Sequence, residues 1–189
     1  MLFKAVGSCR KIRARLFSSE PPSWNTISQF RWFLPIQTRW KDNDQYGHIN
    51  NAVYHSIYDT VINVFLIRHV GLDLESAVLP RGYMVTNSCT FLGSARYPEV
   101  YLAGLGVSKL GNTSVRYKLC LFPQKNPEES LLLNLKDGHN PTDPVVRRFA
   151  ENGLVQGDFV HVFVDPKTEK PVHISQEWRS KLDLLTNHY

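Results

Sequence analysis

Apolar residues recur at intervals of three and four in the stretch between Asn50 and Gly71, which is the period of one face of an α-helix. They are Val53, Ile57, Val61, Val64, Phe65 and Ile67. Asn50 or Asn51 is suited to cap the start, because an Asn side-chain oxygen accepts hydrogen bonds from free backbone N–H groups. Gly71 is suited to end the helix in a left-handed conformation. The pattern predicts a helix of about 18–20 residues, apolar enough to be largely buried.

Segments rich in β-branched and aromatic residues flank this helix and predict strands separated by turns. We place these strands at residues 30–40, 83–92, 100–109, 114–122 and 154–165. Pro35 indicates an edge position or a bulge in the first strand, because proline cannot donate to a strand ladder. A long polar loop is expected at about 123–152 with a short helix at 145–150, and a C-terminal helix at 176–185.

One long apolar helix among strands joined by turns predicts an α+β fold, in which an antiparallel β-sheet wraps around a single central α-helix. A single sheet covers only part of such a helix, so we expect a homodimer or a homotetramer. Two sheets joined at an edge would also remove an exposed edge strand.

The positive charge of the chain is concentrated at its N-terminus. Residues 1–19 hold five of the 22 basic residues and none of the 17 acidic ones, so the other residues carry 17 of each. An Arg-rich, acid-free segment with interleaved apolar residues is typical of a mitochondrial transit peptide, and we expect a protein of the mitochondrial matrix. A disordered basic tail is the alternative. Residues 20–29 are expected to be a linker, and residues 30–189 a single domain.

The charge balance and hydropathy of the domain argue against two classes of partner. The equal numbers of basic and acidic residues in residues 20–189 leave no basic excess for nucleic acid, and no apolar run approaches the ~20 residues of a membrane span. The three cysteines, Cys9, Cys89 and Cys120, have no metal-ligand spacing. We therefore expect no metal site and buried, unreactive thiols in the domain.

Acidic residues and a histidine gather immediately before the predicted helix. Asp42 and Asp44 stand two apart, Gly47 is placed where a missing Cβ lets a substrate approach the backbone, and His48 follows Asp44 by four residues. The first turn of a helix has free N–H groups and a partial positive charge, which would stabilise the negative charge on a carbonyl oxygen during acyl transfer. A carboxylate would supply the base or the nucleophile. The alternative is that these residues only cap the helix.

The full loop carries a family resemblance. Trp40–Asn51 reads WKDNDQYGHINN and is followed by Tyr54, Tyr58 and Asp59. This stretch resembles the signature of the 4-hydroxybenzoyl-CoA thioesterase-like family, which has a form close to D-x-D-x-x-G-H-x-N-N-x-x-Y, and the plant acyl-carrier-protein thioesterases have a related loop. The order of strand, helix and strand meander is also similar over residues 30–185. The resemblance implies a hotdog fold and an acyl-CoA thioesterase.

The resemblance also implies roles for single residues. Asp44 would be the catalytic carboxylate, as general base or as nucleophile, and the backbone amides around Gly47 and His48 would polarise the thioester carbonyl. The His48 side chain would orient water or share the base role. Tyr46 and Asn51 would contact the substrate, although plant-type enzymes carry Asn at the first position and some bacterial relatives carry His at the second. No cofactor is implied, because CoA is part of the substrate.

Two other functions remain open. A hotdog dehydratase or hydratase would use a pattern similar to D-x-N-P-x-H, whereas this loop lacks the proline and separates Asp44 from His48 by one residue too few. The other is a non-catalytic hotdog subunit of a mitochondrial complex. The acyl group of a thioesterase substrate cannot be read from the loop, because a fold does not determine its substrate.

Overall fold

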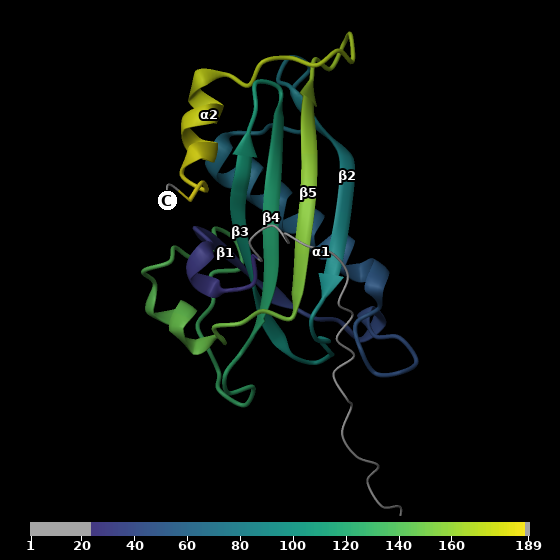
Figure 1. Ribbon diagram of the computed structural model, residues 1–189, viewed down its shortest axis with the longest axis vertical. Helices are drawn as coiled ribbons and strands as arrows, with labels where there is room; N and C mark the ends of the chain where they lie inside the picture. Colours follow the sequence, from purple (N-terminus) through teal and green to yellow (C-terminus); the bar gives the residue numbers. More distant parts are fainter. Residues whose placement is uncertain (1–23, 188–189) are drawn as a thin grey trace, which may run out of the picture.

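The computed structural model describes residues 24–187, and the predicted transit peptide at residues 1–19 lies outside this range. Five antiparallel strands form one sheet in the order β1-β3-β4-β5-β2. They are β1 (Trp32–Gln37), β2 (Arg81–Phe91), β3 (Val100–Leu110), β4 (Ser114–Pro123) and β5 (Val155–Val164). The sheet packs on one long helix, α1 (Asn51–Phe65), and a shorter helix, α2 (Gln176–Asp183), lies beside the sheet (Figure 1). This is the predicted α+β arrangement, and it is the hotdog fold that the loop resemblance implied.

The central helix begins and ends where its sequence predicts. The side-chain oxygen of Asn50 accepts a hydrogen bond from the Ala52 amide at 3.0 Å. The helix continues into a π-helical turn, η3 (Leu66–Val70), and Gly71 ends it with a φ of 95°. The buried residues of α1 are Tyr54, Ile57, Tyr58, Val61, Ile62 and Phe65. No helix within residues 24–187 is long and apolar enough to cross a membrane.

Alternate residues of the strands face α1 and form the main core. In β5, Val155, Gly157, Phe159, His161 and Phe163 are buried, and the residues that alternate with them are half-buried. This alternation follows from the two-residue period of a strand. The buried hydroxyl of Tyr58 donates to the carbonyl oxygen of Val155 at 2.5 Å, so the polar end of this core tyrosine is satisfied.

A second apolar cluster lies on the sheet face that points away from α1. It joins residues of β1, β3 and β4 to residues 123–152, called below the 123–152 segment. Its buried members are Phe30, Phe33, Leu102, Cys120, Phe122, Val146 and Phe149. Ile27 packs against the cluster, and the ring of Trp24 meets that of Phe30 at a centroid distance of 5.7 Å. Part of the expected linker at 20–29 is therefore packed on the domain, because its apolar side chains cover this face of the sheet.

The 123–152 segment is irregular, as expected, but it is anchored to the sheet. The short helix predicted at 145–150 is a 3-10 helix, η4 (Pro144–Arg148). At the free edge of β1, the amide of Phe33 donates to the carbonyl of His139 at 3.0 Å, and the amide of His139 donates back at 2.8 Å. The segment therefore covers part of one edge of the sheet.

Strand β2 forms the other edge of the sheet. Most of its residues are exposed, including the large apolar side chains of Tyr83, Val85 and Phe91. An edge strand of this kind offers unpaired backbone groups and apolar side chains to another strand.

All five predicted strands are present, with ends that differ from the predicted ones by a few residues.

Candidate active site

The chain between β1 and α1 forms a tight turn that its own backbone stabilises. The amide of Asp44 donates to the carbonyl of His48 at 2.7 Å, and the amide of Gly47 donates to the carbonyl of Asp44 at 3.2 Å. Gly47 has a φ of 77°, a region that glycine adopts without steric cost. The buried residue Ile49 donates its amide to the carbonyl of Ala95 at 2.8 Å, which ties the turn to the connection between β2 and β3.

The Asp44 carboxylate is held only through backbone amides. Its Oδ1 accepts hydrogen bonds from the amides of Tyr46 at 2.8 Å and His48 at 3.3 Å. Its Oδ2 has no hydrogen-bond partner among residues 24–187. Burial raises the pKa of the nearby Tyr54 hydroxyl, and the charges of Cys89 and Asp44 add to this effect.

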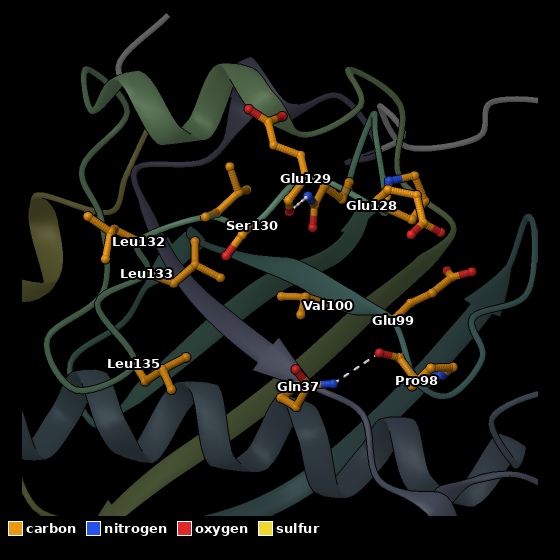
Figure 2. Close-up of a pocket in the computed structure, with 13 residues that line it drawn as sticks. Gln37, Pro98, Glu99, Val100, Glu128, Glu129, Ser130, Leu132, Leu133 and Leu135 are labelled. Carbon is orange, nitrogen blue, oxygen red and sulfur yellow. Dashed lines mark hydrogen bonds between the residues drawn. The ribbon is translucent and has the colours of Figure 1, made fainter.

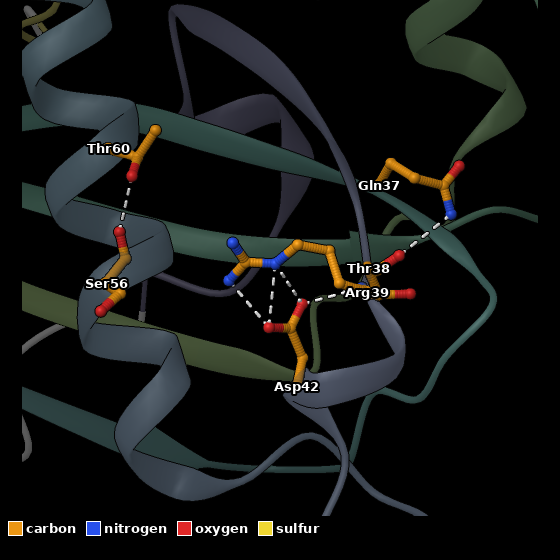
Figure 3. A network of polar contacts seen from close by, with 6 residues as sticks. All are labelled: Gln37, Thr38, Arg39, Asp42, Ser56 and Thr60. Atoms are coloured by element: carbon orange, nitrogen blue, oxygen red, sulfur yellow. Dashed lines mark hydrogen bonds and ion pairs between the residues drawn. The ribbon is translucent and has the colours of Figure 1, made fainter.

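Asp42 differs from Asp44 because its carboxylate is fully engaged. It is 3% exposed, its Oδ1 lies 2.8 Å from Nη2 of Arg39, and its Oδ2 accepts from the Arg39 amide at 2.8 Å (Figure 3). Burial opposes the charge on Asp42, but the hydrogen bonds and positive charge of Arg39 outweigh burial and hold the pKa of Asp42 below its usual value. Asp42 therefore organises the loop as a hydrogen-bond acceptor.

The sequence did not identify Arg39 as the partner of Asp42. The only indication was that these two opposite charges stand three residues apart, a spacing that is common in polar turns. The buried position of Asp42, which makes the pair structurally important, depends on packing of the loop against the domain.

The start of α1 corrects one expectation about the loop. The helix begins at Asn51, so Gly47 and His48 lie in the preceding turn and not in the first turn of the helix. Their amides donate to the carbonyl and to the side chain of Asp44. Asn50 is the N-cap, one of the two residues expected there, and it follows His48 by two residues. The Asn51 amide has no partner in the described part of the chain.

The structure brings most of the predicted site residues into one small region. Asp44, Tyr46, Gly47 and His48 share the turn, and Asn51 opens the helix that follows it. Asp44 is half-buried, whereas the other four are exposed, with Tyr46 at 76%. These groups are therefore open to a ligand or to a second protein chain.

A groove of about 500 Å³ lies between β1 and α1 and reaches this loop. Arg39 and Asp42 line one part of it, and apolar side chains of β1 and α1 form its walls. A second cavity of about 780 Å³ adjoins the groove (Figure 2). It lies between the 123–152 segment and the neighbouring ends of β1 and β3, at Gln37 and Val100. Gln37 and Leu135 line both cavities. No sequence pattern placed Leu135 next to α1.

The cysteines do not supply a nucleophile that rivals the aspartates. Burial raises the pKa of Cys89 to about 11 and that of Cys120 to about 12. Both thiols therefore stay protonated near neutral pH, and the thiolate is the reactive form. Within residues 24–187, no three His, Cys, Asp or Glu side chains are grouped to hold a metal ion.

Comparison with known proteins identifies the family. A model of the thioesterase superfamily matches residues 46–130. The crystal structure of the PA5185 protein from Pseudomonas aeruginosa is 35% identical, with 87% of this chain and 97% of that chain covered and a TM-score of 0.69. The chain belongs to the thioesterase superfamily, which confirms the resemblance carried by its loop. A search of curated protein sequences finds no match.

More distant structures share the fold. Slr0204, a 1,4-dihydroxy-2-naphthoyl-CoA thioesterase from Synechocystis, is 13% identical over 80% of this chain and 94% of that chain, with a TM-score of 0.61. SAV2348 from Staphylococcus aureus, solved in complex with CoA, is 13% identical over 84% of this chain and 87% of that chain, with a TM-score of 0.62. Family membership supports thioester hydrolysis as the class of reaction.

Proposed function

We propose that this protein hydrolyses acyl-CoA thioesters and that Asp44 is its catalytic carboxylate. One observation supports the choice of Asp44 over Asp42. Both carboxylate oxygens of Asp42 are bound by Arg39, whereas Asp44 keeps Oδ2 free of partners among the described residues. A carboxylate with a free oxygen can accept a proton or attack a carbonyl carbon, and one locked in an ion pair is a poorer base.

As a general base, Asp44 takes a proton from a water molecule whose oxygen bonds to the thioester carbonyl carbon. The carbon–sulfur bond then breaks, the sulfur takes up a proton, and the free acid and CoA leave. As a nucleophile, Asp44 attacks the same carbon, expels the CoA thiolate and forms an acyl anhydride that water hydrolyses. The His48 side chain orients the water in either route.

The carbonyl oxygen gains negative charge in both routes and needs N–H donors. We assign this role to the amides of Gly47, His48 and Asn51, with Tyr46 contacting the substrate beside them. The unpartnered amide of Asn51 supports the assignment, as does the long 3.3 Å bond of the His48 amide, which a substrate oxygen could replace. The reaction needs no cofactor beyond the CoA of its substrate.

The test of the reaction is a panel of short, long and aromatic acyl-CoAs with the purified protein, followed by release of the CoA thiol. Hydrolysis of at least one member, lost in Asp44→Ala, is the expected result. Hydration of an enoyl-CoA without thiol release would instead identify a hydratase. A protein that hydrolyses no member and co-purifies in a large assembly would be the non-catalytic subunit.

We also propose that two chains pair through β2 to form a homodimer. The exposed apolar side chains of this edge strand support the proposal. Light scattering on the purified protein should give twice the chain mass, and Val85→Lys on the edge should yield monomers. Leu184→Lys, at another exposed apolar position, should leave the dimer intact. A monomeric wild type, or a dimer unaffected by Val85→Lys, would contradict this arrangement.

We propose that residues 1–19 direct the protein to the mitochondrial matrix. Their net positive charge and lack of acidic residues support this. A fluorescent fusion of the full chain should be found in mitochondria, and a fusion that lacks residues 1–19 should not. The same distribution for both fusions would contradict the proposal.

A further inference from the structure

The 123–152 segment contributes a wall to the groove between β1 and α1. Leu34 and Ile36 of β1 and Ile57 and Val64 of α1 line the groove, and Leu135 lines it from the 123–152 segment. These five side chains are apolar, which is the usual lining of a site that takes an apolar ligand. Leu135 is itself 61% exposed, so an occupant of the groove would cover it.

The opposite part of the groove is polar and leads to the catalytic loop. Arg39 extends from the end of β1 towards the helix face that carries Ser56 and Thr60, with the Asp42 carboxylate beside it (Figure 3). Asp42 and Asp44 are two residues apart, so their Cα atoms lie within ~7 Å of each other. The Arg39–Asp42 end of the groove is therefore the end that lies nearer to Asp44 along the chain.

Several contacts hold the 123–152 segment against β1 and against η3, the continuation of α1. The carbonyl oxygen of Asp137 accepts a hydrogen bond from Nε1 of Trp32 at 3.0 Å and lies 3.0 Å from Nε2 of His69. The Asp137 carboxylate lies 3.6 Å from Nε of Arg68. Since these contacts are two residues from Leu135, they set the position of that side chain as an end wall of the groove.

We propose that this groove holds the acyl chain of the substrate and that Leu135 sets the chain length that the protein accepts. The inference rests on the proposed thioesterase function. Ser56 and Val64, which line the groove, are eight residues apart on α1, so the groove follows the helix for ~12 Å. An extended alkyl chain with carbon–carbon bonds of ~1.5 Å covers that length with roughly 8–10 carbons. The preferred substrates are unbranched acyl groups of this medium length.

The second cavity explains why the chain should end at Leu135. Glu128 and Glu129 of the 123–152 segment line this cavity, as do several leucines (Figure 2). A hydrocarbon chain that passed Leu135 would displace water from these carboxylates, which is unfavourable. The groove therefore accepts a chain up to Leu135 and disfavours a longer one.

Two substitutions of opposite size test the proposal through the chain-length profile of kcat/KM. Leu135→Trp shortens the groove and should lower kcat/KM for decanoyl-CoA about tenfold or more while leaving butyryl-CoA unchanged. Leu135→Ala opens the end wall and should raise the relative rate with hexadecanoyl-CoA. Leu132→Trp is the matched control, because Leu132 is 98% exposed and lines only the second cavity. An unmoved profile in both Leu135 variants overturns the proposal.

Binding of a non-hydrolysable thioether, S-decyl-CoA, tests the groove without the reaction. Wild type should bind it about tenfold or more tightly than S-butyl-CoA, and Leu135→Trp should remove that gain whereas Leu132→Trp keeps it. If no acyl-CoA is hydrolysed but the tighter binding of S-decyl-CoA depends on Leu135, the groove is confirmed as a binding site and the proposed reaction is wrong. If hydrolysis occurs but the gain is absent or independent of Leu135, the reaction stands and the groove proposal is overturned.

Discussion

Replacing Asp44 by Asn and by Ala separates a catalytic carboxylate from a loop-stabilising one. Asp44 holds the turn through Oδ1, which accepts from the amides of Tyr46 and His48. Asn keeps an oxygen acceptor at this position and lacks the charge, whereas Ala lacks both. A catalytic role therefore predicts a similar loss of activity in the two variants, and a purely structural role predicts a loss only in Asp44→Ala.

The magnitudes of the two effects differ enough to be told apart. Loss of a general base lowers the rate by roughly 10²–10⁴-fold, which corresponds to about 2.7–5.5 kcal/mol of activation free energy. Loss of the Oδ1 acceptor in Asp44→Ala costs about 0.5–2 kcal/mol of folding free energy. Asp44→Asn keeps that acceptor, so its folding free energy should change by less than that of Asp44→Ala.

The assay is release of the CoA thiol from the best substrate of the panel, with kcat/KM compared among the variants and urea unfolding measured in parallel. Asp165→Asn is the matched control. Its Oδ1 accepts from the amides of Lys167 at 3.0 Å and Thr168 at 2.7 Å in an exposed turn outside the candidate site. Wild-type activity in Asp44→Asn, with activity lost only in Asp44→Ala, would refute the catalytic assignment.

Three further predictions concern stability. Gly138→Ala should cost about 1–3 kcal/mol in urea unfolding, because Gly138 has a φ of 73° and a Cβ there would lie 2.5 Å from the Phe33 carbonyl oxygen; an unchanged midpoint would contradict this. Tyr58→Phe should cost about 0.5–1.5 kcal/mol in thermal unfolding, since its buried hydroxyl bonds a strand carbonyl, and a variant as stable as wild type would argue against that bond. Because Arg39 holds the folded-state pKa of Asp42 below 3.8, the ionised carboxylate stabilises the fold above that value and this contribution is lost as the pH falls through the folded pKa. The stability gap between wild type and Asp42→Asn should therefore be full at about pH 7 and shrink in acid, and a gap independent of pH would show that ionisation of Asp42 contributes nothing.

Local sequence determines the elements of this protein and the place of its candidate site. The apolar period between Asn50 and Gly71 specifies α1, because one buried face of a helix repeats every 3.6 residues. The strands follow from segments rich in β-branched and aromatic residues that turn residues separate. The turn around Gly47 is also local, since Asp44 and His48 bond each other within four residues.

The tertiary structure determines two features of the candidate site that the local sequence does not predict. The two aspartates of the loop are nearly equivalent in the sequence, and only packing buries Asp42 in the ion pair with Arg39 and leaves an oxygen of Asp44 free. The groove is a stronger case, because the contact of Asp137 with Trp32 joins residues 105 positions apart. The apolar period and the turn residues of a segment do not indicate which distant segment packs on it. The position of Leu135 beside α1 is therefore seen only in the folded chain.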